Sequence, residues 1–249
     1  MGMRSLSQPG SRRILFITGT DTGVGKTLLT ALLLAHLRSR GHHAIALKPF
    51  CSGTRADAEL LHSLQDGDLS LDEINPFYFP EPIAPLVAAR IHHRRIPLAR
   101  VLQHIHSVLA RHSSPIKNQK SKIKNPFLLI EGSGGLLVAL GEGYSVLDLI
   151  TALNCEVVVV ARNKLGTINH TLLTTQTLQR AGNRKLSVAL MDCKTKDVSA
   201  GSNYRTLAEL LAPIQVHSIP FLRSSSRTAA AVKKNAAILA RLLTRVAFL

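Results

Sequence analysis

The segment TGTDTGVGKTLLT, residues 18–30, constrains the fold of this chain more than any other feature. It follows a short apolar run, RRILFIT, and contains Gly25-Lys26-Thr27, which ends the phosphate-binding loop pattern G-x-x-x-x-G-K-[ST]. The first glycine of that pattern should stand at position 20, but the chain has a threonine there and its glycine at position 19. A glycine loop between a buried strand and an amphipathic helix predicts a nucleotide-binding site, and the early glycine leaves the class of nucleotide enzyme open.

The residues of this loop have separate expected roles. Its glycines let the backbone curl so that N–H groups point at phosphate oxygens, while the N-terminal end of the next helix adds positive potential. We expect Lys26 to reach the β- and γ-phosphates and Thr27 to hold Mg²⁺. The residues predicted to bind the nucleotide here are Gly23, Val24, Gly25, Lys26 and Thr27.

Apolar runs and helical patterns alternate along the rest of the chain. This alternation predicts a mostly parallel β-sheet with helices on both faces, in a single P-loop α/β domain of residues 13–249 that follows an extension of residues 1–12. Ligands of such sheets bind at the carboxyl ends of the strands. Strands are predicted at 12–18, 43–48, 127–132, 156–162, 186–192 and 215–220, and helices at 25–40, 97–112, 145–153, 167–181, 202–212 and from about 227.

Composition narrows the choice of partners. The 249 residues include 31 Lys and Arg against 15 Asp and Glu, a formal charge of +16, which favours anionic partners such as nucleotides, carboxylated metabolites or, non-specifically, nucleic acid. Part of the excess lies at 113–125, which reads as a solvated surface loop or as a binding arm. Three cysteines without a C-x-x-C pair suit a reduced cytoplasmic protein, and no apolar run approaches the roughly 18 residues of a membrane span.

Further candidate residues follow the predicted strands. Glu131 ends an apolar strand, is followed by Gly132 in the turn GSGG, and stands where a second Mg²⁺ ligand is expected beside a phosphate loop. Lys48 ends another strand and, with Ser52, could present an ammonium and a hydroxyl to one reacting centre. Asp57, taken alone, is a helix-start residue or a surface acid. The Pro-rich stretch 75–89 is expected to be an ordered loop that forms a wall of the site.

With these motifs in this order, the chain resembles the dethiobiotin synthetase family, whose phosphate loop carries the same extra residue. The likeness runs from about residue 13 to the C-terminal helix and rests on GTDTGVGKT at 19–27, KPFCSG at 48–53, EGSGG at 131–135, KLGTINH at 164–170 and IPFL at 219–222. It implies a cytoplasmic, homodimeric, Mg²⁺-dependent ligase of biotin synthesis. Such an enzyme uses ATP to join CO₂ to 7,8-diaminononanoate, and it needs neither a membrane nor a specific nucleic acid.

The resemblance also implies roles for individual residues. Lys26 and Lys48 would neutralise the phosphates and a carbamate, with Thr22 and Ser52 as hydroxyl partners. Thr27, Asp57 and Glu131 would hold Mg²⁺, so Asp57 becomes a metal ligand through the resemblance alone. Gly132, Ser52 and Asn169 would bind the diamine, and Asn169 would come from the neighbouring subunit. Asp192 and Pro220 would contact the nucleotide base.

One departure from the family pattern concerns the base. Asp192 stands where the family usually has an asparagine that reads adenine, with the alignment open by one residue at Met191. An asparagine side chain both donates and accepts, whereas an ionised aspartate only accepts. We therefore expect a relaxed or altered base preference that admits GTP or CTP.

Three other classes of protein share parts of this pattern. Partitioning ATPases share the fold but use a signature lysine five residues before the loop lysine, where this chain has Asp21. A glutamine-dependent amide ligase needs a glutaminase domain for which 249 residues leave no room. A catalytically silent binding module does not account for Lys26, Thr27, Lys48 and Glu131 together.

Overall fold

The computed structural model describes residues 13–112, 127–222 and 228–249. Its centre is a six-stranded sheet in the order β10-β9-β8-β1-β5-β2, in which every neighbouring pair is parallel. The middle strands are runs of Val, Ile, Leu and Phe that are almost fully buried, as expected for a parallel sheet covered on both faces. The strands are β1 (Arg13–Gly19), β2 (Ala44–Leu47), β5 (Phe127–Glu131), β8 (Glu156–Arg162), β9 (Leu186–Met191) and β10 (Gln215–Ile219).

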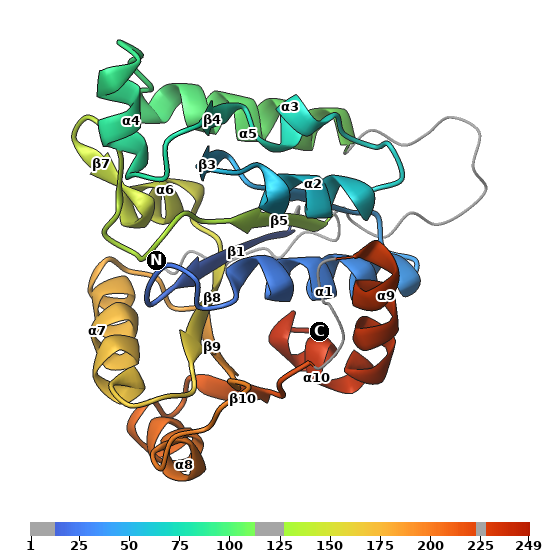
Figure 1. Cartoon of the computed structure of the whole chain (residues 1–249), viewed down its shortest axis with the longest axis vertical. Helices are drawn as coiled ribbons and strands as arrows, with labels where there is room; N and C mark the ends of the chain where they lie inside the picture. Colours follow the sequence, from blue (N-terminus) through green and yellow to red (C-terminus); the bar gives the residue numbers. More distant parts are fainter. Residues whose placement is uncertain (1–12, 113–126, 223–227) are drawn as a thin grey trace, which may run out of the picture.

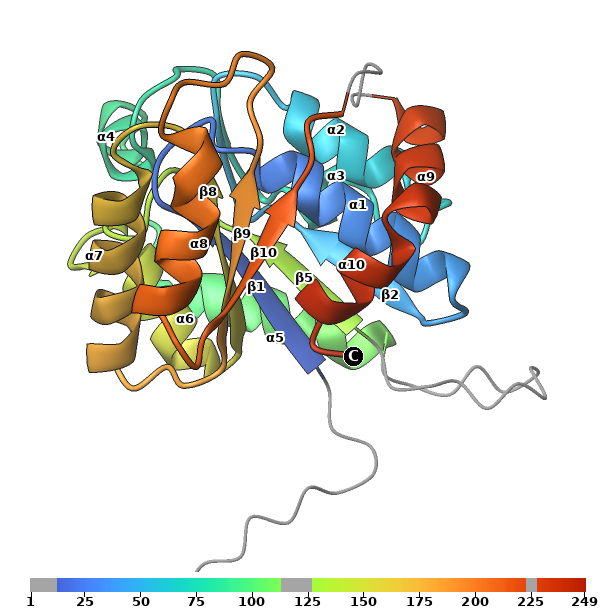
Figure 2. The same ribbon diagram turned by 90° about the horizontal axis from the view of Figure 1, so that it is seen from below.

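Helices cover both faces of this sheet (Figures 1 and 2). On one side, α1 (Lys26–Ser39) packs against α9 (Ala229–Ile238) and α10 (Ala240–Val246), and the run from Leu29 to Leu37 is buried on every side. On the other side lie α6 (Val146–Leu153), α7 (Thr167–Arg180) and α8 (Ala200–Leu210). α5 (Leu98–His112) packs beside α6. The predicted fold class, a single α/β domain with a mostly parallel sheet, is confirmed.

Short elements between β2 and α5 form a separate layer above the sheet edge (Figure 1). β3 (Phe50–Ser52) pairs in parallel with β4 (Phe77–Phe79), and the rings of Phe50 and Phe77 stack with centroids 5.0 Å apart. α2 (Ala56–Ser63), α3 (Leu71–Ile74) and α4 (Pro85–Ile91) complete the layer. The sequence predicted only an ordered loop at 75–89, whereas β4 and the start of α4 occupy part of that stretch.

Other boundaries differ slightly from those predicted. β2 ends at Leu47, because Lys48 and Pro49 turn away from the sheet, and the predicted C-terminal helix divides into α9 and α10 at Leu239. A two-stranded antiparallel pair, β6 (Ala139–Gly141) and β7 (Tyr144–Ser145), was not expected. The 1–12 extension and the 113–125 loop lie outside the described residues. Within the described part of the chain, none of the helices has the length and apolar character that crossing a membrane requires.

Candidate active site

The phosphate loop runs from the end of β1 to the start of α1 and is anchored on β8, where the Thr20 amide donates to the Val160 carbonyl at 2.9 Å. Gly23 and Gly25 have φ angles of +69° and +109°, which only glycine adopts without strain. The early glycine also has a steric reason, since a Cβ on Gly19 would lie 2.7 Å from the Val24 side chain and 3.1 Å from Lys26 Nζ. The displaced glycine therefore makes room for the buried Val24 and for the loop lysine.

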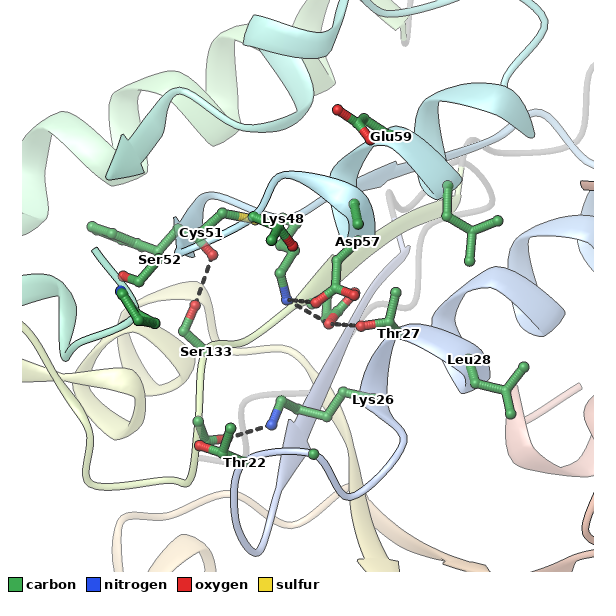
Figure 3. A pocket seen from close by; sticks show the side chains of 18 of the residues that line it. Thr22, Lys26, Thr27, Leu28, Lys48, Cys51, Ser52, Asp57, Glu59 and Ser133 are labelled. Carbon is green, nitrogen blue, oxygen red and sulfur yellow. Dashed lines mark hydrogen bonds and ion pairs between the residues drawn. The ribbon is translucent and has the colours of Figure 1, made fainter. Parts of the chain in front are cut away.

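Lys26 is held by neutral acceptors. Its Nζ donates to the carbonyl oxygen of Asp21 at 2.9 Å. It also donates to the carbonyl oxygen of Gly134 at 2.7 Å, the dashed line from Lys26 in Figure 3. Burial lowers the pKa of Lys26 to about 8, and the nearby positive charge of Lys48 adds to that effect. The Lys26 ammonium is thus a desolvated charge beside a loop built to receive an anion.

Lys48 is held by carboxylates. Leu47 pairs with Ile130 across β2 and β5, so Lys48 and Glu131 follow side by side at the carboxyl ends of these strands. Lys48 Nζ lies 2.5 Å from Glu131 Oε1 and 3.3 Å from Asp57 Oδ2, while the Thr27 hydroxyl donates to the same Glu131 oxygen at 2.6 Å (Figure 3). Burial by itself would lower the pKa of Lys48, but the two carboxylates outweigh burial and raise the pKa above its ordinary value.

This cluster has the composition of a magnesium site. Glu131 is 1% exposed, and its second oxygen, Oε2, is buried without a hydrogen-bond partner among the described residues. A buried carboxylate oxygen without a partner is costly, and a hard cation shared with Thr27 and Asp57 would satisfy it. The described part of the chain holds no group of three or more His, Cys, Asp or Glu side chains arranged for a metal. The remaining ligands of an octahedral Mg²⁺ would therefore come from nucleotide and water.

A second network fixes the turn after Lys48. The buried Asn75 side-chain amide donates to the carbonyl of Lys48 at 2.9 Å and of Pro49 at 3.3 Å. Arg55 in turn donates to the Asn75 side-chain oxygen at 3.2 Å and to its carbonyl at 3.0 Å, and stacks over Tyr78. Sequence reasoning missed this role of Arg55. The only available signal was an arginine two residues before Asp57.

The two lysines and the cluster of Thr27, Asp57 and Glu131 line one cavity of about 1070 Å³. Its wall beyond the lysines is made by Pro82–Pro85, as predicted for the Pro-rich stretch, and an unpredicted arm reaches Leu28, Leu60 and Thr228. The Ser52 hydroxyl is buried without a partner among the described residues, while the Ser133 hydroxyl donates to the Phe50 carbonyl at 2.8 Å. The predicted site residues that line the cavity are Thr22, Gly23, Gly25, Lys26, Thr27, Lys48, Ser52, Asp57 and Glu131.

The other predicted site residues do not line this cavity. Val24 is packed under the loop, and a Cβ on Gly132 would lie 3.0 Å from the Phe16 ring, so the absence of a side chain there serves packing. Asn169 is exposed on the first turn of α7, and Pro220 is exposed after β10.

Asp192 follows β9 and is engaged within its own chain. Its Oδ1 accepts from the Asn163 amide at 2.8 Å, and its Oδ2 pairs with Lys196 Nζ at 2.8 Å. Although burial opposes the change, the hydrogen bonds from Lys196 and Asn163 lower the pKa of Asp192. This carboxylate is therefore ionised at neutral pH and can only accept.

A family model described as an AAA domain matches residues 13–229. The chain is 39% identical over 203 residues to the ATP-dependent dethiobiotin synthetase BioD of Anaeromyxobacter sp. (strain Fw109-5), covering 80% of this chain and 85% of that protein. The chain belongs to the dethiobiotin synthetase family. The dethiobiotin synthetase BioD of Bacillus velezensis (strain DSM 23117 / BGSC 10A6 / LMG 26770 / FZB42) is 34% identical over 212 residues, covering 83% of this chain and 85% of that protein.

Similarity to solved structures extends over the whole fold of this dethiobiotin synthetase family member. A ParA family ATPase from Chlorobium tepidum TLS has a TM-score of 0.56 at 13% identity and covers 96% of this chain and 99% of its own. The MinD cell division protein of Aquifex aeolicus has a TM-score of 0.55 at 14% identity, covering 95% of both chains. At this level of identity the likeness concerns the fold alone.

Proposed function

We propose that this protein is an ATP-dependent dethiobiotin synthetase, a cyclo-ligase of biotin biosynthesis that joins CO₂ to 7,8-diaminononanoate and releases ADP and phosphate. The observation that carries this function is the pair of buried lysines in one cavity, Lys26 against the phosphate loop and Lys48 against Glu131 and Asp57. A reaction that passes a phosphoryl group from one anion to another needs cationic groups on both sides of the transfer.

The chemistry proceeds in three balanced steps. One amine of the substrate adds to CO₂ and loses a proton, which forms a carbamate. A carbamate oxygen then attacks the γ-phosphorus, so that ADP leaves and a carbamic–phosphoric mixed anhydride forms. The second amine attacks the anhydride carbon, the C–O bond to phosphate breaks, and loss of a proton leaves the cyclic urea.

The residues of the cavity divide this work. The loop amides and Lys26 bind and neutralise the phosphate chain, while Lys48 and the hydroxyl of Ser52 orient the carbamate oxygen toward the γ-phosphate. Thr22, at the mouth of the loop, adds a second hydroxyl on the substrate side. The unpartnered Ser52 hydroxyl supports this assignment, because a bound carbamate would supply its missing hydrogen bond.

Thr27, Asp57 and Glu131 are the residues that would hold Mg²⁺. When bound, the ion would neutralise charge on the β- and γ-phosphates. Lys48 lies against the same two carboxylates, so its ammonium would stand beside the bound ion and could contact the carbamate.

We also propose that the protein acts as a homodimer. Asn169, the predicted partner of the substrate's carboxylate, does not line the cavity of its own chain, which supports its supply by a second subunit. The exposed apolar side chains of Leu165, just before α7, and Leu173, on α7, stand four residues on either side of it in sequence and are 79% and 56% exposed, which suits an interface. The free thiols of Cys51, Cys155 and Cys193 support a reducing, cytoplasmic setting.

Asp192 supports a broader base preference than adenine alone. An acceptor-only side chain can bind the amino group of adenine or cytosine but cannot donate to a ring nitrogen. We expect ATP, GTP and CTP to be used with more similar kcat/KM values than an adenine-selective enzyme shows. Strong selectivity for ATP would remove this part of the proposal.

Product formation tests the proposed function directly. The protein is incubated with 7,8-diaminononanoate, bicarbonate, Mg²⁺ and each nucleotide in turn, and dethiobiotin is sought by mass spectrometry. No dethiobiotin with any nucleotide would reject the function. Diamine-independent ATP hydrolysis in its place would favour the alternative, a partitioning-type P-loop ATPase, against which Asp21 at the signature position argues.

A further inference from the structure

Arg162 lies beside the phosphate loop without belonging to it. It is the last residue of β8, two positions beyond Val160, whose carbonyl accepts the Thr20 amide and anchors the loop. One guanidinium nitrogen, Nη2, lies 3.9 Å from the point where a Cβ atom on Gly23 would stand. The Arg162 guanidinium therefore reaches the loop at its second glycine.

The guanidinium has no partner within the described residues. The Arg162 side chain is exposed, and its guanidinium makes no hydrogen bond, ion pair or ring contact with any residue of 13–112, 127–222 and 228–249. Arg38, Arg55 and Arg90 each pair with a carboxylate. Arg162 instead carries a positive charge next to the phosphate loop that no residue of the described part of the chain neutralises.

The surroundings of Arg162 favour an anion. The loop amides and the N-terminal end of α1 present positive potential on the inner side of the loop, and Lys26 adds a desolvated charge. A guanidinium matches phosphate better than an ammonium does, because its planar fork donates two parallel hydrogen bonds. An anion bound by the loop would give Arg162 the partner that the protein itself does not provide.

We propose that Arg162 binds the phosphate chain of the nucleotide beside the loop at Gly23, in addition to Lys26. The inference rests on the nucleotide use in the proposed function but not on the identity of the second substrate. A Cβ placed on the next loop glycine, Gly25, would lie 3.2 Å from the Met191 Cε, so Arg162 and Met191 approach the loop at successive glycines.

The test is the affinity for Mg²⁺-ATP, Mg²⁺-ADP and adenosine, measured by titration calorimetry without diamine. Arg162→Gln should raise the Kd of ATP about tenfold or more and leave adenosine binding unchanged, because each charge-assisted hydrogen bond carries roughly that factor. Arg162→Lys should fall between the two proteins, since it keeps the charge and loses the fork. Comparison of ATP with ADP shows whether the γ-phosphate is the contacted group.

Arg184→Gln is the matched control. Arg184 is also exposed and has no partner within the described residues, but it precedes β9 at the amino end of the sheet, so its loss removes the same charge far from the loop. Its ATP Kd should stay within about twofold of the wild-type value. Thermal unfolding of the three variants checks that each is folded.

A Kd for ATP that is unchanged in Arg162→Gln would overturn the inference, even if the KM for the diamine rose, since that result would place the guanidinium on the substrate's carboxylate. The test also separates this inference from the proposed function. If no dethiobiotin forms but Arg162→Gln still loses ATP affinity, the proposed function fails while the role of Arg162 stands.

Discussion

Two buried lysines in one cavity have opposite electrostatic surroundings. Lys26 donates to two neutral carbonyls, and its pKa falls to about 8, whereas Lys48 lies between two carboxylates and its pKa is raised. Both side chains are 7% exposed or less, so the difference comes from their partners and not from burial. Lys48 has its counter-charges within the protein. Lys26 pairs with no carboxylate of the described residues and would gain a counter-charge from a bound anion.

This contrast explains how one cavity can hold two anions in order. The nucleotide phosphates satisfy Lys26 first, and binding of Mg²⁺ by Glu131 and Asp57 would then weaken their hold on Lys48. On this proposal phosphate would bind without disturbing the second lysine, which would become available to the carbamate. Four measurements test whether the two lysines differ in this way.

The largest expected difference is in stability. Lys48→Met leaves the Glu131 carboxylate, 1% exposed, without its cation, and loss of one partner of a buried ion pair costs about 3–5 kcal/mol of unfolding free energy. Lys26→Met removes a charge that has no counter-ion and should cost nothing or stabilise the protein. Urea unfolding at pH 7 measures both, and the double variant Lys48→Met/Glu131→Gln should recover most of the loss. Equal losses for the two single variants would contradict the contrast.

Nucleotide affinity should show the reverse order. Lys26→Met removes the cation nearest the loop, and we expect the Kd of ATP to rise about tenfold to a hundredfold, in line with roughly 1.5–3 kcal/mol for hydrogen bonds to charged groups. Lys48→Met should change the Kd of ATP by no more than about threefold. Titration with a non-hydrolysable ATP analogue decides the matter, and a larger loss for Lys48→Met would reverse the assignment.

The lowered pKa of Lys26 has a consequence for pH dependence. Between about pH 8 and 10.5 the unfolded chain keeps the Lys26 proton while the folded protein has lost it, so unfolding takes up a proton and stability rises with pH. Relative to Lys26→Met, the wild-type unfolding free energy should gain up to about 1.4 kcal/mol per pH unit in this window. The raised pKa of Lys48 gives no such gain in stability. Its contribution to the unfolding free energy is constant below the pKa of an unfolded lysine and is lost only as the pH rises above that value. A flat difference from pH 8 to 10 would show that Lys26 is not desolvated as described.

The smallest expected effect concerns the support of Lys48. Arg55→Lys loses the guanidinium fork that holds Asn75, and we expect about 1–2 kcal/mol of lost stability and a several-fold lower kcat, with the Kd of ATP unchanged. Arg100→Lys, an exposed arginine over the Phe77 ring, is the control and should alter neither value. An unchanged kcat in Arg55→Lys would limit Arg55 to a structural role.

The fold was largely predictable because its signals are local. The loop ending in Gly25-Lys26-Thr27 sits between an apolar run and a helical pattern, and Glu131 ends another apolar run, so both could be placed at the carboxyl edge of a parallel sheet. α2 and the β3–β4 pair were missed since they are short. α2 buries only Ala58 and Leu61, and no periodicity emerges from so few residues.

The parts of the site that escaped prediction depend on long-range contacts. From sequence alone Asp57 was a helix-start residue or a surface acid, and the structure brings it to 3.3 Å from Lys48. The Arg55–Asn75 contact joins residues 20 positions apart, and no local pattern encodes it. Gly19, by contrast, was a visible irregularity whose reason, the space taken by Val24, needed coordinates.

We propose that Lys26 serves nucleotide binding, whereas Lys48 serves the transfer of the γ-phosphoryl group to the carbamate. The most direct test of this division is the amount of dethiobiotin that Lys48→Met forms in a single turnover when it is saturated with Mg²⁺-ATP, 7,8-diaminononanoate and bicarbonate. Lys48→Arg takes its place if the methionine variant does not fold. We expect Lys48→Met to bind ATP nearly as the wild type does and to lose turnover by orders of magnitude. Dethiobiotin formation at close to the wild-type rate would contradict it.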